Sequence, residues 1–191
     1  MKSRALLAFL AVTLLASGCA LNDNNEWQTV VCSVQKINDG VPVVSAALNA
    51  GDPANPDDDY VPLDMITVLF WARPYSAAST ITPEGAYSAF IITGYSATWT
   101  PGPNAPAELT TYNVTRGNLS ARVPINDEFQ VSFLLCPQEI KQEPWYPAAG
   151  SAEVYTANLS LVFYGHAEGS EHEVEVPAGT TVTFLGAISD N

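Results

Sequence analysis

The fold class is decided by one stretch, residues 87–100, which reads YSAFIITGYSATWT. Its residues alternate at a period of two, which is the side-chain period of a β-strand. Prolines and a glycine in residues 101–106 end the run. The pattern predicts a long strand, one face of which is formed by Tyr87, Ala89, Ile91, Thr93, Tyr95, Ala97 and Trp99.

The same alternation continues on both sides of this stretch, interrupted by clusters of Gly, Pro, Asn and Asp. Pro42 makes the strand after the turn at residues 38–40 an edge strand. One helical turn is expected, over residues 138–142, and the set Phe129, Val131, Phe133 and Leu135 is expected to face inward. The further predicted strands are Trp27–Ile37, Val41–Leu48, Met65–Arg73, Asn118–Val123, Glu128–Leu135, Ala152–His166, Glu171–Val176 and Thr180–Ala187.

About seven to nine short strands separated by turns are typical of an antiparallel β-sandwich of the immunoglobulin or fibronectin type III class. A barrel is the alternative. Strands and turns run without an internal repeat from residue 27 to residue 191, so we expect a single domain over 27–191.

The N-terminal residues resemble a bacterial lipoprotein signal. Lys2 and Arg4 precede an uncharged run, residues 5–16, which is shorter than the roughly twenty apolar residues that span a bilayer. The run ends in LLASGC at residues 14–19, which is similar to the lipobox, although Ala16 stands where leucine is preferred. The resemblance implies a signal peptide over 1–18 and a lipid on Cys19; a buried apolar helix with an incidental cysteine is the alternative.

The residues that follow Cys19 indicate where the domain is held. Each acyl chain on this cysteine would contribute about 0.8 kcal/mol per buried methylene, so several chains anchor stably. Residues 19–26 form a short lipidated tether, and Ala20 in place of Asp implies the outer membrane by resemblance to lipoprotein sorting rules. We therefore expect a protein of the bacterial cell envelope for which the membrane is the anchor and not the ligand.

The charge of the chain excludes one class of partner. Twenty acidic side chains against 7 basic ones give a formal net charge of -13. So few lysines and arginines cannot neutralise a row of phosphates, and we expect no nucleic-acid partner. With 47% hydrophobic residues the chain is also too apolar for a disordered acidic tail.

Two cysteines remain once Cys19 is assigned to the lipid. Cys32 and Cys136 would lie in an oxidising compartment, which favours a disulfide between them. Such a bond would close a loop of about 100 residues and stabilise the fold by roughly 4 to 5 kcal/mol on the chain-entropy model. The alternative is two separate buried thiols, because free cysteine is often a core residue.

The two histidines, His166 and His172, flank one predicted hairpin. With a three-residue turn they would face each other and could share zinc or copper with Glu168, Glu171 or Glu173, which would permit a metal-dependent hydrolase. A two-residue turn would instead pair His166 with Glu171. The alternative is a solvated acidic hairpin, which we favour, and the sequence holds no other catalytic constellation such as a Gly-x-Ser-x-Gly elbow.

An acidic loop and an aromatic loop are the remaining candidates. Asp57, Asp58 and Asp59, with Asp52 nearby, could bind calcium through carboxylates and turn carbonyls, or form a solubilising loop. Trp145 and Tyr146 lie between two prolines and could form an exposed binding platform, or fold back over one end of the core. Apart from a possible calcium ion, no cofactor is expected.

Three strand phrases, FIITGY at residues 90–95, LSARVP at 119–124 and VFYG at 162–165, resemble those of uncharacterised bacterial lipoproteins with fibronectin-like or immunoglobulin-like sandwiches. The resemblance implies the fold and no activity. The sequence therefore predicts a lipid-anchored, non-catalytic module for binding, adhesion or scaffolding, with a protein partner in the envelope. A calcium-stabilised structural module is the alternative.

Overall fold

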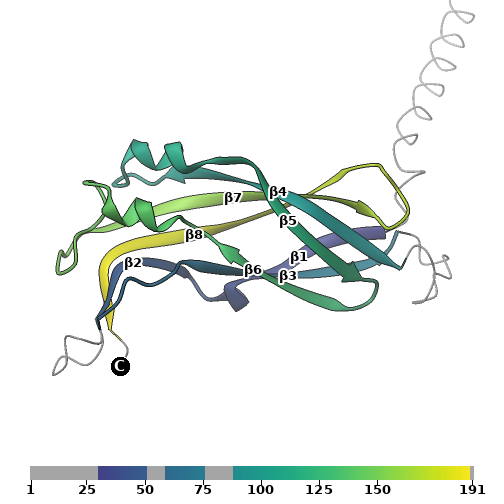
Figure 1. Ribbon diagram of the computed structural model, residues 1–191, viewed down its shortest axis with the longest axis horizontal. Coiled ribbons are helices and arrows are strands. Elements are labelled where there is room, and N and C mark those ends of the chain that lie inside the picture. Colours follow the sequence, from purple (N-terminus) through teal and green to yellow (C-terminus); the bar gives the residue numbers. More distant parts are fainter. Residues whose placement is uncertain (1–29, 51–58, 76–87, 190–191) are drawn as a thin grey trace, which may run out of the picture.

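The computed structural model describes residues 30–50, 59–75 and 88–189, and this part of the chain is built from β-strands (Figure 1). No helix among these residues is long and apolar enough to cross a membrane. The strands are β1 (Val30–Ile37), β2 (Val43–Ala50), β3 (Met65–Pro74), β4 (Ala89–Pro101), β5 (Val114–Pro124), β6 (Glu128–Leu134), β7 (Val154–Ala167) and β8 (Val174–Ser189). Short 3-10 turns occur at η1 (Asn38–Gly40), η3 (Ala107–Tyr112) and η4 (Gln138–Gln142), the last of which is the predicted helical turn.

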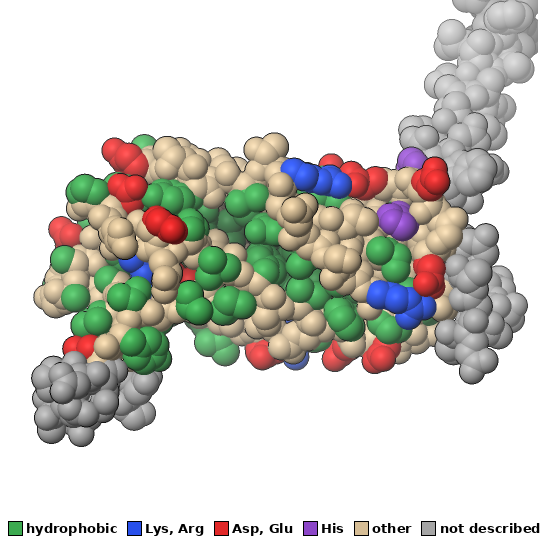
Figure 2. Space-filling view, viewed as in Figure 1, with side chains coloured by type: hydrophobic (Ala, Val, Ile, Leu, Met, Phe, Trp, Pro, Cys, Tyr) green, Lys and Arg blue, Asp and Glu red, His purple; other side chains and the backbone are tan. Residues whose placement is uncertain are grey.

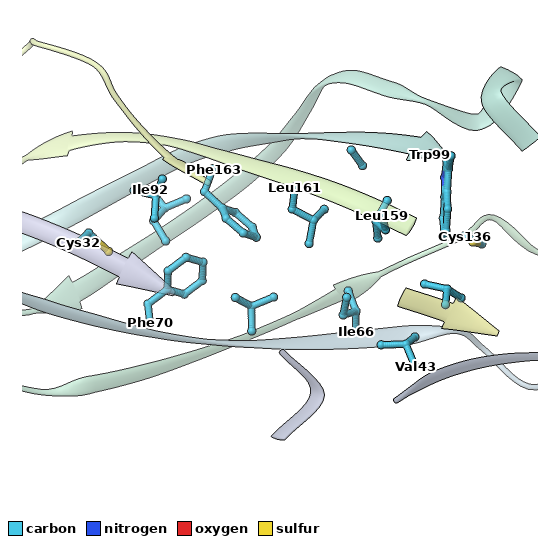
Figure 3. Packing of buried hydrophobic residues seen from close by; sticks show 14 of the residues in the cluster. Cys32, Val43, Ile66, Phe70, Ile92, Trp99, Cys136, Leu159, Leu161 and Phe163 are labelled. Atoms are coloured by element: carbon cyan, nitrogen blue, oxygen red, sulfur yellow. The ribbon is translucent and has the colours of Figure 1, made fainter. Parts of the chain in front are cut away.

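The strands form two sheets with the orders β1-β3-β6 and β2-β8-β7-β4-β5. Apolar side chains from both sheets meet in one core (Figure 3). Phe70 of β3 meets Phe163 of β7 edge to face, with ring centroids 4.8 Å apart. Such a pair contributes about 0.5–1.5 kcal/mol beyond its buried area. The predicted all-β fold with two packed sheets is confirmed.

One pairing differs from the prediction of a purely antiparallel sandwich, because β2 runs parallel to β8. β1 pairs with β3 in one sheet, and the chain then crosses at η1 to the other sheet, where β2 lies beside β8 (Figure 1). The crossing uses positive φ angles at Asn38, Asp39 and Gly40, which the sequence Asn-Asp-Gly tolerates well. The first two strands therefore belong to different sheets.

The predicted single face of residues 87–100 does not hold through the middle of the strand, and Tyr87 lies outside the described residues. Phe90 and Ile92 point into the core, whereas Thr93 is exposed; Ala97 and Trp99 are buried as the alternation requires. From Ile92 to Gly94 β4 advances two residues while β7 advances only one, from Gly165 to Tyr164, so β4 carries one extra residue, a bulge at Thr93. This extra residue exchanges the two faces of the strand beyond it.

The β6 set from Phe129 to Leu135 faces the core only partly. Val131, Phe133 and Leu135 pack against the core cluster but stay half-buried, and Phe129 is 36% exposed. Among the described strands β6 pairs only with β3 and forms the edge of its sheet, so one flank of these side chains has no described neighbouring strand.

Candidate functional site

A cluster of polar side chains is buried at the end of the two-sheet fold where β3 begins. Lys141 of η4 places its Nζ 2.9 Å from Asp64 Oδ1, and the two side chains are 4% and 3% exposed. The same Nζ donates a hydrogen bond to the carbonyl of Pro62. On the other side, Ser45 of β2 donates to Asp64 Oδ2, and the Tyr146 hydroxyl lies 2.6 Å from Ser45 Oγ.

Apolar packing holds each member of this cluster in place. Ile140, next to Lys141, is fully buried and fixes η4 against the core. The ring of Tyr146 packs edge to face on Phe184 of β8, with centroids 5.9 Å apart. The carbonyl of Asp64 accepts a hydrogen bond from the amide of Leu135, which ties the start of β3 to the end of β6.

Burial determines what the cluster can do. Desolvation raises the pKa of the Tyr146 hydroxyl and of the neighbouring Cys136 thiol, so both stay protonated at neutral pH. Ser45 is 0% exposed, so an external substrate cannot reach its hydroxyl. The cluster therefore fits a role within the fold better than the conversion of a bound substrate.

The histidine hairpin does not adopt either of the turns considered from sequence. The ladder between β7 and β8 ends where Gly165 pairs with Val174, so His166 pairs across it with neither His172 nor Glu171. His166 Nδ1 lies 3.0 Å from the carbonyl of Ala167. Both histidines lie at the same end of the molecule (Figure 2), but the described residues hold no group of His, Cys, Asp and Glu able to bind a metal ion.

Two arginines, which the sequence pattern did not single out, form ion pairs with two of the glutamates predicted as possible metal ligands. Arg116 forms two hydrogen bonds with Glu173 and lies 4.0 Å from the centre of the Tyr164 ring. Arg122 pairs with Glu168 at 3.0 Å. Hydrogen bonds from the arginines lower the pKa of both carboxylates. Two of the three glutamates considered as metal ligands are therefore paired with arginines in the described structure.

The predicted disulfide is absent, because Cys32 and Cys136 are separate buried thiols (Figure 3). Cys32 lies opposite Ala72, near the end of β3, whereas Leu134 lies opposite Met65, at its start. At about 3.3 Å per residue, this register separates the two cysteines by more than roughly 20 Å, beyond the reach of a disulfide. Burial raises the pKa of Cys32 to about 12.

The aromatic loop packs against the domain and does not form an exposed platform. Tyr146 is 5% exposed and belongs to the core cluster. Trp145 is half-buried between Tyr112 and Tyr146, with ring centroids 6.4 and 6.1 Å away. The fold-back alternative considered from sequence describes both residues.

The structure describes only some of the remaining residues that were predicted to form sites. Asp57 and Asp58 lie outside the described residues, as do Asp52, Cys19 and the whole of residues 1–29. Asp59, the last member of the aspartate run, is exposed. The calcium and lipid predictions thus stay predictions.

A cleft of about 550 Å³ lies between β1 and the first half of β8. β2 pairs with β8 only from Val182 onward, so in the described structure the earlier part of β8 has a strand on one side only. Of the strands that the structure describes, β1 likewise pairs only with β3. Two sheet edges therefore flank the cleft, and Lys36 is the charged side chain among the described residues that line it.

No family model matches the chain, and no curated protein matches it.

Proposed function

We propose that this chain is a lipid-anchored, non-catalytic binding module of the bacterial cell envelope, built on an immunoglobulin-like sandwich. The strand order supports the fold class. In this arrangement β1 and β2 act as two halves of one first strand, and each half joins a different sheet. The second half, β2, lies parallel to the last strand, β8. The buried Trp99 of β4 fits the core tryptophan of such domains.

The observation that carries the binding role is the cleft between β1 and β8. Its walls include strand edges, whose backbone groups can pair with an extended segment of another protein. Gly179 in this part of β8 leaves room for close approach of a backbone, whereas Pro177 has no N–H and cannot donate to an added strand. The polar cluster around Ser45 is closed to solvent, so the cleft is the better place for a partner.

The cleft is tested by cross-linking in intact cells with a C-terminal tag on the full chain. We compare the wild type with a Lys36→Glu/Gly179→Glu variant, which puts two carboxylates into the cleft. A Cβ at Gly179 would lie 3.4 Å from the carbonyl of Leu159, an ordinary contact, so this variant should fold. Ser120→Glu, on the exposed face of β5, is the matched control.

A discrete cross-linked species is expected for the wild type and for Ser120→Glu, and its loss is expected for the cleft variant. The same species in all three proteins would place the partner elsewhere on the surface. The lack of any specific species would contradict the binding role itself.

The anchor is tested separately with Cys19→Ala. We expect the wild type in the membrane fraction and labelled by radioactive palmitate, and the variant unlabelled and released. Equal labelling of the two proteins would overturn the proposal that Cys19 is lipidated, and it would leave the proposal that the cleft binds a partner unaffected.

A further inference from the structure

The buried side chains of Lys141 and Asp64 carry the two groups, an amine and a carboxyl, from which an amide bond forms. An amine and a carboxyl group lie 2.9 Å apart between Nζ and Oδ1, in a place where both side chains are almost fully removed from water. We propose that Lys141 Nζ and Asp64 Cγ condense into an amide after the domain has folded, which makes this pair an intramolecular isopeptide cross-link. The proposal does not depend on the binding role.

Burial favours the amide over the ion pair. Two charges taken out of water carry a desolvation penalty that their mutual attraction repays only in part. A proton passed from Nζ to Oδ1 removes both charges and leaves a free amine beside a neutral carboxylic acid. Because η4 and the start of β3 hold the two groups together, the reaction is intramolecular and needs no encounter.

The neighbouring side chains are arranged for this reaction. Ser45 donates its hydroxyl proton to Asp64 Oδ2, the oxygen on which negative charge develops when the amine attacks Cγ. Tyr146 lies behind Ser45 at 2.6 Å, and because the proton of Ser45 is already committed, the phenol is the donor of that second bond. The carbonyl of Pro62 accepts a hydrogen of Nζ and can keep this bond once the nitrogen has become an amide N–H.

The atoms of the step balance without an external reagent. After the proton transfer to Oδ1, the lone pair of Nζ forms the bond to Cγ, and the carbonyl electrons move onto Oδ2. The collapse of this intermediate breaks the bond between Cγ and Oδ1, which takes a second proton from Nζ and leaves as water. Nothing is oxidised or reduced, and the products are one amide and one water molecule.

Other charged pairs of the described structure do not share this setting. Arg116 and Glu173 are 47% exposed, and Arg122 is 51% exposed. A guanidinium group that stays protonated has no lone pair with which to attack a carboxyl carbon. Lys36 is exposed. Among the described residues, Lys141 is thus the buried lysine that faces a buried carboxylate.

The test is the covalent mass of the purified full chain and its tryptic map. The cross-linked protein is lighter than a Lys141→Arg variant by one water molecule beyond the difference between the two side chains. Trypsin does not cut at a lysine whose amine is an amide, nor at Arg73, which precedes a proline. The wild type should therefore yield residues 37–116 joined to residues 123–191, with no cut after Lys141.

The ion-pair alternative predicts a different map. Residues 37–116, 123–141 and 142–191 would then appear as three separate peptides at their sequence masses, and this result overturns the proposal. The measurement is made on the wild type, so it does not depend on whether any variant folds. Ser45→Ala should slow the appearance of the joined peptide after synthesis by about 10²-fold, the usual effect of losing one oxyanion donor. An unchanged rate would remove Ser45 from the reaction.

Discussion

Gly165 of β7 and Gly179 of β8 offer a matched pair of glycine-to-alanine changes within the same sheet. A Cβ at Gly165 would overlap the carbonyl oxygen of Ile91 and the ring of Phe90, whereas at Gly179 the nearest atom, the carbonyl oxygen of Leu159, is 3.4 Å away. Either alanine restricts the unfolded chain and thereby adds about 0.4–1 kcal/mol to stability. Forcing a methyl group into the first site costs about 1–3 kcal/mol, because a backbone oxygen cannot move aside cheaply.

Gly179→Ala should therefore be as stable as the wild type or slightly more so, and Gly165→Ala should be less stable than Gly179→Ala by about 2 kcal/mol. For a domain of this size a gap of that magnitude corresponds to roughly 4–8 °C in Tm. Urea unfolding followed by tryptophan fluorescence gives the free energies, and thermal unfolding followed by circular dichroism gives the Tm. Equal midpoints for the two variants would show that Phe90 and Ile91 do not crowd Gly165 as described.

Three further outcomes are expected. Tyr146→Phe removes a buried hydroxyl from its hydrogen bond and should lower the free energy of unfolding by about 1–2 kcal/mol, measured in urea. Cys32 and Cys136 should resist a thiol reagent in the native state and react fully after unfolding. Burial raises the pKa of both thiols, so above the ordinary thiol pKa the unfolded chain loses these protons before the folded chain does. The free energy of unfolding should therefore fall as the pH rises through that range. The lowered pKa of Glu168 implies a contribution to stability that is present above the ordinary glutamate pKa and is lost as the pH falls through the folded value. A carbon-detected NMR titration of Arg122→Gln should move that pKa back up, and an unmoved value would contradict the pairing.

The strands themselves could be predicted from the sequence, because Gly, Pro, Asn and Asp mark the turns between them. The predicted span Met65–Arg73 matches β3 to within one residue. The predicted strands at 171–176 and 180–187 are one strand, β8, since Pro177 and Gly179 do not interrupt pairing with β7 and lie where the described residues place no strand on the other side. Composition alone does not say which side of a strand is left open.

The candidate sites depended on contacts between distant parts of the chain, which single-sequence reasoning does not supply. Nothing near Lys141 points to Asp64, and the two meet only because η4 packs over the start of β3. The bulge after Ile92 is equally hidden, although Gly94 at that position is the kind of residue that permits one. The number of cysteines and an oxidising compartment predict a disulfide between Cys32 and Cys136. The registers of β1 and β6 along β3 instead keep the two cysteines at opposite ends of the core.

The parallel alignment of β2 with β8 bears on how the domain withstands force. β1 begins at one end of the molecule, and β8 finishes at the other (Figure 1). Tension applied to the two ends of the described chain acts along the β2–β8 ladder, from Val43 opposite Val182 to Ala50 opposite Ser189. The load is therefore shared by the whole ladder in shear and does not open it one hydrogen bond at a time like a zipper.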